Sequence, residues 1–182
     1  EQRQPMDIVN EMLIPALDRV GAEFEQNKVF LPQLIQSAGA AQAAFDVIRQ
    51  HMATGGQEQV NRGPIVVATV KGDIHDIGKN IVKVLLENYG YTVVDLGRDV
   101  DPSRVVEAVR QHKAPLVGLS ALMTTTLHSM EQTIALLRKA NLPCKVVVGG
   151  AVLTAAYAKQ IGADFYAQDA QQSVGVARQG IG

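Results

Sequence analysis

The feature that most constrains how this chain can fold is a regular alternation of strand-like and helix-like segments after residue 63. Five short segments of apolar, largely β-branched residues are predicted as strands, at residues 65–70, 92–96, 116–120, 146–148 and 165–167. The segments that follow them are predicted as helices, at residues 78–89, 102–112, 127–140, 154–161 and 171–179. Because parallel strands are connected through helices that cover both faces of a sheet, this order indicates an α/β fold.

The right-handedness of the crossovers leaves few possible strand orders for a chain of this size. We predict a flavodoxin-like (Rossmann-like), doubly wound, parallel five-stranded sheet with the order 2-1-3-4-5, in a domain covering residues 64–182. Pro102 is expected to begin its helix, because proline suits the first helical position, and Asp101 is expected to cap it.

The first 54 residues have a different pattern, with apolar side chains at the spacing of a helix face. One face contains Val9, Met12, Leu13, Leu17, Val20 and Phe24, and a second contains Leu34, Ala38, Ala41, Phe45, Ile48 and Met52. Pro15 predicts a break near Leu13 and a new helix that starts at the proline. Two or three helices cannot bury faces this apolar by themselves and need a partner surface, so we expect an incomplete helical-bundle cap at residues 1–54. We expect a polar, glycine-bearing linker at residues 55–63.

The overall composition excludes several classes of function. Seventeen basic and 18 acidic residues give a net charge of −1, which provides no electrostatic attraction to nucleic acid or to an anionic membrane. Cys144 is the single cysteine, so an internal disulfide is impossible. No apolar run reaches the ~20 residues of a membrane helix, and the polar start has no signal-peptide character. We therefore expect a cytoplasmic protein, and since residue 1 is not Met, a piece of a longer chain.

Small and polar residues gather after the predicted strands one, three and four, at residues 71–80, 120–126 and 149–150. In open α/β sheets, ligands bind at the carboxyl ends of the strands, where the strand order reverses. Asp73 and His75 are two residues apart, so in an extended backbone their side chains point to the same side. A carboxylate that accepts the proton of one imidazole nitrogen leaves the other nitrogen free to bind a metal. Gly78 would allow close approach of a bulky ligand.

The same loop residues allow other interpretations. An isolated Asp-x-His after a strand is more often an acidic loop with a surface histidine. A phosphate-binding P-loop is excluded because Lys79 lacks the preceding glycine pattern. A receiver-type phosphorylation site would need an aspartate where Ser120 stands, and a zinc site would need more Cys or His nearby.

Three motifs carry a resemblance to a known family. They are D-x-H-x-x-G at Asp73–Gly78, S-x-L at Ser120–Leu122, and the pair Gly149-Gly150. Together with the longer stretch 72–82 they resemble the B12-binding module of cobalamin-dependent methionine synthase and of the corrinoid proteins that serve anaerobic methyltransferases. Residues 30–34 resemble the helical cap of those proteins, so the resemblance covers nearly the whole chain.

The resemblance implies a cobalamin or methylcobalamin cofactor whose cobalt is bound from below by His75. The cofactor's own dimethylbenzimidazole would leave the metal and thread down a channel between the sheet and a helix. Asp73 would accept the other imidazole proton, and Thr126, where methionine synthases have a serine, would complete a catalytic relay of His75, Asp73 and Thr126. His75 is the one metal ligand expected from the protein.

Further cofactor contacts follow from the same resemblance. Ser120 would hydrogen-bond the nucleotide tail, Gly149 and Gly150 would leave room for it, Thr124 would line the corrin ring, and Phe30 would cover its upper face. The complete expected set is Phe30, Gly72, Asp73, Ile74, His75, Asp76, Gly78, Ser120, Leu122, Thr124, Gly149, Gly150, Tyr166 and Ala170.

The resemblance also implies a function, namely a methyl carrier that cycles between Co(I) and methyl-Co(III). Residues 150–157 and 162–170 favour the methionine synthase type, a 5-methyltetrahydrofolate–homocysteine methyltransferase of methionine biosynthesis. The partners would be methyl-donor and methyl-acceptor methyltransferase domains or subunits, without which this part is not catalytic. Alternatives are a stand-alone corrinoid protein of another methyltransferase system, a B12-sensing regulatory module, an adenosylcobalamin mutase subunit, and a binding module without corrinoid.

Overall fold

The structure is a computed structural model that describes residues 5–54 and 61–181. The chain divides into two compact units, one made of Glu1–Asn61 with Glu87–Gly90, and the other of Arg62–Leu86 with Tyr91–Gly182. Most of the linker predicted at 55–63 lies outside the described residues, as do residues 1–4 and 182 of the two predicted domains.

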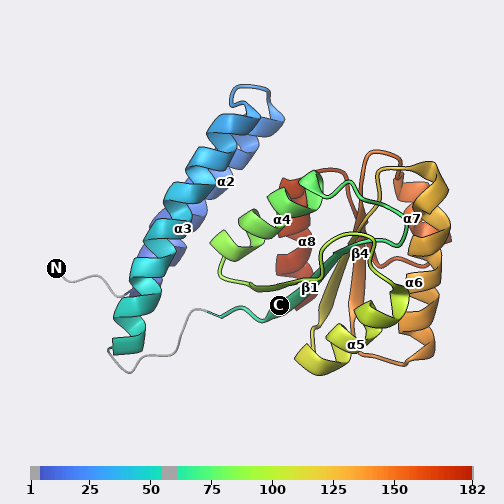
Figure 1. Cartoon of the computed structure of the whole chain (residues 1–182). Helices are drawn as coiled ribbons and strands as arrows, with labels where there is room; N and C mark the ends of the chain where they lie inside the picture. Colours follow the sequence, from blue (N-terminus) through green and yellow to red (C-terminus); the bar gives the residue numbers. More distant parts are fainter. Residues whose placement is uncertain (1–4, 55–60, 182) are drawn as a thin grey trace. The chain divides into compact units, whose positions relative to one another are not determined.

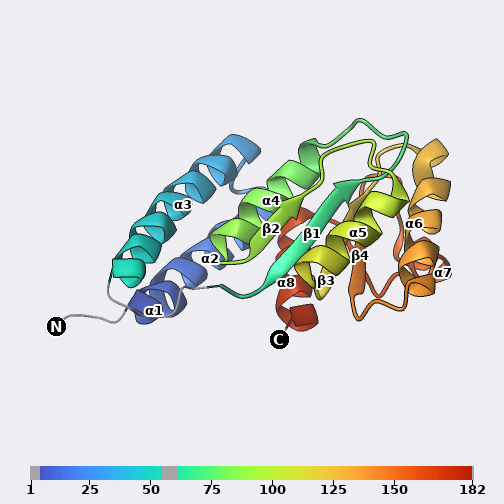
Figure 2. The ribbon, with the colours of Figure 1, turned by 60° about the horizontal axis from the view of Figure 1, so that its bottom comes forward.

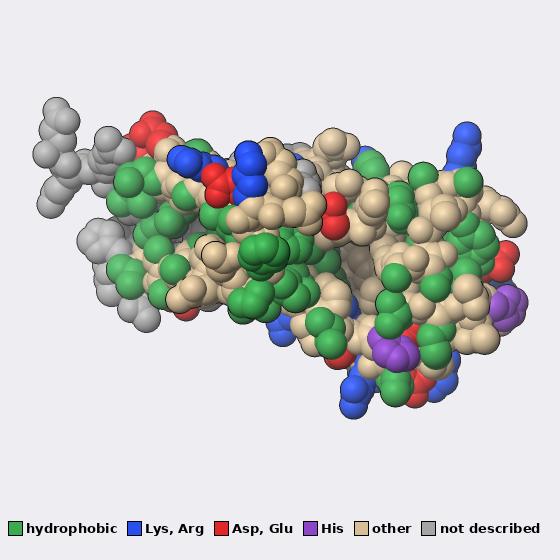
Figure 3. Space-filling view, turned by 90° about the horizontal axis from the view of Figure 1, so that it is seen from above, with side chains coloured by type: hydrophobic (Ala, Val, Ile, Leu, Met, Phe, Trp, Pro, Cys, Tyr) green, Lys and Arg blue, Asp and Glu red, His purple; other side chains and the backbone are tan. Residues whose placement is uncertain are grey.

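The first unit is built around two long helices, α2 (Ile14–Glu25) and α3 (Leu31–Thr54), which pack side by side (Figures 1 and 2). A short helix α1 (Pro5–Ile8) and a π-helical turn η1 (Val9–Leu13) precede them. The predicted apolar faces contribute its buried side chains, which include Leu17, Leu34, Ala38, Ala41 and Ile48. Other large apolar side chains stay exposed, namely Met12, Phe30, Leu31, Ile35 and Val47. On the face drawn in Figure 3, green hydrophobic side chains gather over this unit.

The predicted break near Leu13 is not an interruption, because the chain stays helical from Pro5 to Glu25. A new α-helix, α2, nevertheless begins beside Pro15, as predicted, with the proline in its first positions. Leu13 itself has helical backbone angles, with φ −70° and ψ −48°. Proline lacks an N–H group, and its ring would clash with the carbonyl four residues earlier in a regular helix. The wider π turn just before Pro15 accommodates that ring without ending the helix.

The second unit contains a parallel sheet with the order β2-β1-β3-β4-β5, which confirms the predicted topology. Its strands are β1 (Pro64–Thr69), β2 (Thr92–Asp95), β3 (Leu116–Ser120), β4 (Lys145–Gly149) and β5 (Phe165–Ala167). Five helices accompany them: α4 (Ile77–Asn88), α5 (Pro102–His112), α6 (Leu127–Lys139), α7 (Ala155–Gln160) and α8 (Ala170–Ile181). Helices α4 and α8 lie on one face of the sheet, and α5, α6 and α7 on the other (Figures 1 and 2).

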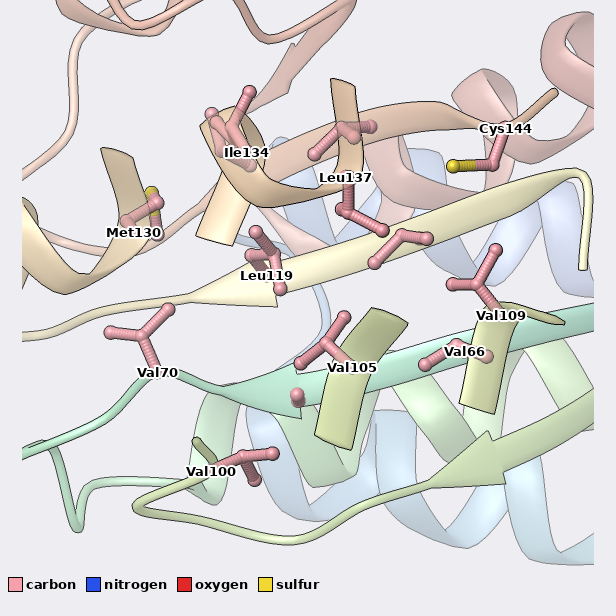
Figure 4. Packing of buried hydrophobic residues seen from close by; sticks show 14 of the residues in the cluster. Val66, Val70, Val100, Val105, Val109, Leu119, Met130, Ile134, Leu137 and Cys144 are labelled. Atoms are coloured by element: carbon pink, nitrogen blue, oxygen red, sulfur yellow. The ribbon is translucent and has the colours of Figure 1, made fainter. Parts of the chain in front are cut away.

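A continuous apolar core lies between the sheet and helices α5 and α6 (Figure 4). Val66 and Leu119 project from β1 and β3 toward Val105 of α5 and Ile134 of α6. All four side chains are at most 2% exposed. Burying a side chain of this size stabilises a fold by roughly 1.5–3 kcal/mol. This packing fixes β1 and β3 side by side and therefore fixes where the loops after them begin.

Helix starts in this unit are stabilised locally. The Asp101 side chain accepts a hydrogen bond from the Ser103 amide at 3.0 Å, which confirms the predicted cap of α5. Thr154 caps α7 in the same way through the Tyr157 amide. None of the described helices combines the length and the apolar character needed to cross a lipid bilayer.

Candidate functional site

The candidate site begins where three neighbouring strands end at the same level. Thr69 of β1, Ser120 of β3 and Gly149 of β4 are partners in the sheet register. The chain therefore leaves the sheet at adjacent points, with residues 70–76 following β1, residues 121–126 following β3, and Gly150 following β4. The loops that the sequence singled out are brought together by this register.

Asp73 is the centre of the hydrogen-bond network at this edge. Its side chain is completely buried. Oδ1 accepts bonds from the His75 amide at 3.0 Å and pairs with Nδ1 of the His75 ring at 2.9 Å. Oδ2 accepts bonds from the amides of Leu122 and Met123, at 2.7 and 3.2 Å, and from the Thr126 hydroxyl at 2.9 Å. The carboxylate thus connects the loop after β1 to the loop after β3.

These contacts determine the protonation of Asp73. Burial alone would raise the pKa of its carboxyl group, but the amides of His75 and Leu122 and the side chains of His75 and Thr126 lower it far below the usual 3.8. Asp73 is therefore ionised at neutral pH and acts as an acceptor only. An ionised acceptor at Nδ1 keeps the imidazole proton on that nitrogen and leaves a lone pair on Nε2.

Replacing Asp73 with asparagine should change how stability depends on pH. A carboxyl group whose pKa is lower in the folded state stabilises the fold fully above its unfolded pKa, near 3.8, and loses this contribution as the pH falls below that value. Asp73→Asn should lower the free energy of unfolding by about 2 kcal/mol above pH ~5. Below pH ~4 the free energy of unfolding should fall less steeply with pH than in the unmodified protein, because asparagine does not take up a proton. Urea unfolding of the cofactor-free protein across this range would measure both effects; parallel curves for the two proteins would contradict the assignment.

The His75 side chain is 45% exposed, and its ring hydrogen-bonds to described residues through Nδ1. Large apolar side chains remain exposed in these two loops and at the start of α4, with Ile74 at 59%, Leu122 at 43% and Ile77 at 74%. A Cβ on Gly78 would have no heavy atom within 4 Å, so this position leaves open space. An available imidazole nitrogen among exposed apolar side chains fits a flat, bulky group that brings its own metal.

The structure contains no alternative metal centre in the parts of the chain that it describes. No group of three or more His, Cys, Asp or Glu side chains in residues 5–54 and 61–181 is arranged to hold a metal ion.

Ser120 and the two glycines of the G-G motif also lie at this edge. The Ser120 hydroxyl is 2.9 Å from that of Thr69, which is completely buried. Gly150 has φ +137°, and a Cβ there would lie 1.9 Å from the carbonyl oxygen of Ala121. A Cβ on Gly149 would lie 3.0 Å from the Ala167 carbonyl oxygen. The neighbouring backbone therefore requires glycine at residue 150, independently of any contact that Gly150 makes with a cofactor.

The other predicted contact residues are spread more widely. Thr124 is exposed in a 3-10 turn, η2 (Thr124–Thr126), and the Asp76 carbonyl accepts a bond from the Asn80 amide in the first turn of α4. Tyr166 of β5 donates its hydroxyl to the Leu153 carbonyl, and Ala170 begins α8. Phe30 is 67% exposed and belongs to the helical unit. Its predicted place over the corrin ring stays a prediction.

Sequence reasoning missed two contributors from the end of β2. Asp99 accepts a hydrogen bond from the Gly72 amide, and Asp95 pairs with Lys79, whose side chain is buried despite its charge. The available signal was the position of both aspartates at or just after the carboxyl end of β2, the end of the sheet at which the other loops also lie.

Comparison with known proteins agrees with the geometry. Residues 63–174 match the family model described as "B12 binding domain", and residues 1–49 match a second model with the same description. The chain is 41% identical over 178 residues to "Dimethylamine corrinoid protein 1" of Methanosarcina mazei, covering 97% of this chain and 82% of that protein.

Two solved structures are similar over almost the whole chain. A cobalamin-binding protein from Desulfitobacterium hafniense has 32% sequence identity and a TM-score of 0.83, with 97% of this chain and 84% of that chain covered. A chain of the methanol:cobalamin methyltransferase complex from Methanosarcina barkeri has 30% identity and a TM-score of 0.82, with 98% and 68% covered. These matches confirm the predicted corrinoid cofactor. The chain belongs to the B12 binding domain family.

Proposed function

We propose that this chain is a corrinoid protein that carries a methyl group for a separate methyltransferase, with Nε2 of His75 as the lower ligand of the cobalt. The observation that carries the proposal is the bond between His75 Nδ1 and the buried Asp73 carboxylate, at 2.9 Å. That bond favours the imidazole tautomer with its proton on Nδ1 and leaves the lone pair of Nε2 for a metal, on a side chain that is 45% exposed.

The proposed chemistry divides between cofactor and protein. Bound cobalamin supplies a cobalt centre that accepts and releases a methyl group. Asp73 orients the His75 ring and increases the basicity of the nitrogen that would bind the metal. The Thr126 hydroxyl has one proton and two acceptors in reach, Asp73 Oδ2 at 2.9 Å and the Met123 carbonyl at 2.8 Å. When it donates to Asp73 it weakens the pull of the carboxylate on the His75 proton, and when it turns to Met123 that pull increases.

The similar proteins support one of the alternatives raised by the sequence. The names of the relatives refer to a dimethylamine corrinoid protein and to a methanol:cobalamin methyltransferase complex. They support a stand-alone corrinoid subunit and do not support the methionine synthase type, nor a role in methionine biosynthesis. We propose that the partners are methyltransferase subunits, that residues 1–54 form the cap and 64–182 the cofactor domain, and that Phe30 and the other predicted contact residues touch the corrinoid. A cytoplasmic location stays a prediction.

The test begins with binding and continues with transfer. The purified chain, mixed with hydroxocobalamin, should keep the absorbance of the corrinoid through gel filtration. After reduction, addition of a methylamine- or methanol-specific methyltransferase with its substrate should convert the cofactor to the methylated spectrum. Protein that elutes colourless would contradict the proposal. If only methionine synthase domains with 5-methyltetrahydrofolate methylate the cofactor, the chain is of the methionine synthase type and the proposal is wrong.

A further inference from the structure

Two aspartates at the carboxyl end of β2 contact the loop that carries His75. Asp99 contacts Gly72 and Asp73, which precede His75 in the chain, and Asp95 pairs with Lys79, which follows it. Neither aspartate belongs to the predicted relay. We propose that Asp99 is a positioning residue that holds this loop and thereby sets where the His75 ring lies when it binds cobalt. The inference rests on the proposed role of His75.

The first support is a ladder of hydrogen bonds that extends the pairing of β1 and β2 beyond the sheet. The Thr69 amide donates to the Gly97 carbonyl at 2.9 Å, and the Val100 amide donates to the Thr69 carbonyl at 3.1 Å. Val70 and Val100 form an isolated parallel bridge. The loop therefore does not leave the sheet freely, because its first residues run beside residues 97–100.

Asp99 makes the last two contacts of that ladder. Its Oδ1 accepts a hydrogen bond from the Gly72 amide at 2.8 Å, and its own amide donates to the Asp73 carbonyl at 2.9 Å. The Lys71 ammonium is 3.4 Å from the same Oδ1. The Gly72 amide lowers the pKa of Asp99, so the carboxylate is charged at neutral pH. Amide bonds to a charged acceptor are stronger than bonds between neutral groups.

The backbone angles explain why an aspartate suits this position. Asp99 has φ +53°, in the left-handed region, which aspartate and asparagine tolerate better than most residues. Gly72, its partner, has φ +84°. These turns bring the two segments close enough for the short Asp99 side chain to reach the Gly72 amide.

Lys79 anchors the other end of the loop, four residues after His75. Its ammonium is 2.6 Å from Asp95 Oδ1 and 2.8 Å from the Asn80 side chain, and the residue is 4% exposed. Asp95 Oδ1 also accepts the Gly97 amide at 2.9 Å. Asp73 is held from the loop after β3 and the ends of its own loop are held from β2, so the backbone that carries His75 has little freedom to move.

The test compares four variants of the full chain. Asp99→Gly keeps the positive φ accessible but removes the acceptor, whereas Asp99→Asn keeps both the φ and an acceptor oxygen. Asp101→Asn is the matched control, because Asp101 bonds to Ser103 in the same segment without contacting the loop and asparagine also caps helices. Asp99→Ala, which adds backbone strain, provides a second variant without the acceptor.

Two measurements separate positioning from simple stability. Hydrogen exchange of residues 70–76 is measured in the cofactor-free protein. The electron paramagnetic resonance spectrum of bound Co(II) cobalamin is recorded with protein whose histidines carry nitrogen-15, because the changed nitrogen splitting then separates a histidine ligand from the cofactor's own dimethylbenzimidazole. Asp99→Gly should speed the exchange about tenfold and lower the ratio of histidine-ligated to unligated cobalt about tenfold. Asp99→Asn should stay within about threefold of the unmodified protein, and Asp101→Asn should change neither value.

The outcomes distinguish this inference from the proposed function. Faster exchange in Asp99→Gly with unchanged ligation would overturn the positioning role, and so would unchanged exchange. Loss of ligation in Asp99→Asn equal to that in Asp99→Gly would also overturn it, because the acceptor would then be irrelevant. If the histidine-derived nitrogen splitting persists in His75→Gly, the proposed ligand itself is wrong, whatever the Asp99 variants show.

Discussion

Replacing His75 with glycine should remove the protein ligand from cobalt and shift the visible spectrum of bound methylcobalamin to that of a cofactor without a lower nitrogen ligand. The reason is geometric, since His75 presents the ring nitrogen that Asp73 leaves available, and the described residues contain no cluster that would replace it as a metal site. Glycine also leaves space in which water can enter. Absorbance at neutral pH, recorded with bound cofactor after gel filtration, measures the change.

His128 offers a matched control for this substitution. It is an exposed histidine in the first turn of α6, where its ring contacts Gln132 and Glu131. His128→Gly should leave the spectrum of the bound cofactor unchanged. If His75→Gly keeps the spectrum of the unmodified protein, His75 is not the ligand; if His128→Gly changes it as much, the shift reports a general disturbance.

Replacing Gly150 with alanine should destabilise the cofactor-free protein by about 3 kcal/mol or more. The added Cβ would lie 1.9 Å from the Ala121 carbonyl oxygen and 2.9 Å from the Ala121 carbonyl carbon, and backbone atoms cannot move aside as a flexible side chain can. The positive φ of Gly150 adds to the cost. For a domain of this size the midpoint of thermal unfolding should fall by roughly 10 °C.

The same substitution should also weaken retention of the corrinoid. Ala121 lies between Ser120 and Leu122, and the Leu122 amide donates to Asp73. Displacing Ala121 therefore disturbs the network that orients His75. Gly175→Ala is the control, because a Cβ at that helical position of α8 has no atom within 4 Å and should stabilise the protein by about 0.5–1 kcal/mol. Equal unfolding midpoints for the two variants would contradict the steric argument.

The strand order and most element boundaries were predictable because they depend on local patterns and general topological rules. Five strands alternate with helices, and the handedness of the crossovers leaves few orders, among them the observed β2-β1-β3-β4-β5. The spacing of Asp73 and His75 predicted that their side chains point to the same side, and the resemblance implied the bond between them that the structure shows. The π turn before Pro15 was not predictable from helical periodicity, because a proline in a helical pattern is compatible with a break, a kink or a wider turn.

The rest of the site depends on contacts between distant parts of the chain. Two of the donors to Asp73 are backbone amides of residues 122 and 123, and an amide carries no sequence signal. Asp99 reaches Gly72 across 27 positions, so its role depends on the exact length of the turn after β2. The G-G motif was noticed, but the cause found for Gly150 is the Ala121 backbone, which only coordinates reveal.

The position of Thr126 bears on how protons reach the Asp73–His75 pair. Its Cγ2 lies 3.5 Å from the point where a Cβ on Gly72 would stand, while Thr126 is 4% exposed and Asp73 is fully enclosed. A serine would lack this methyl group. Because Asp73 is enclosed whereas the His75 side chain is 45% exposed, the imidazole is the member of the pair that can exchange protons with solvent directly.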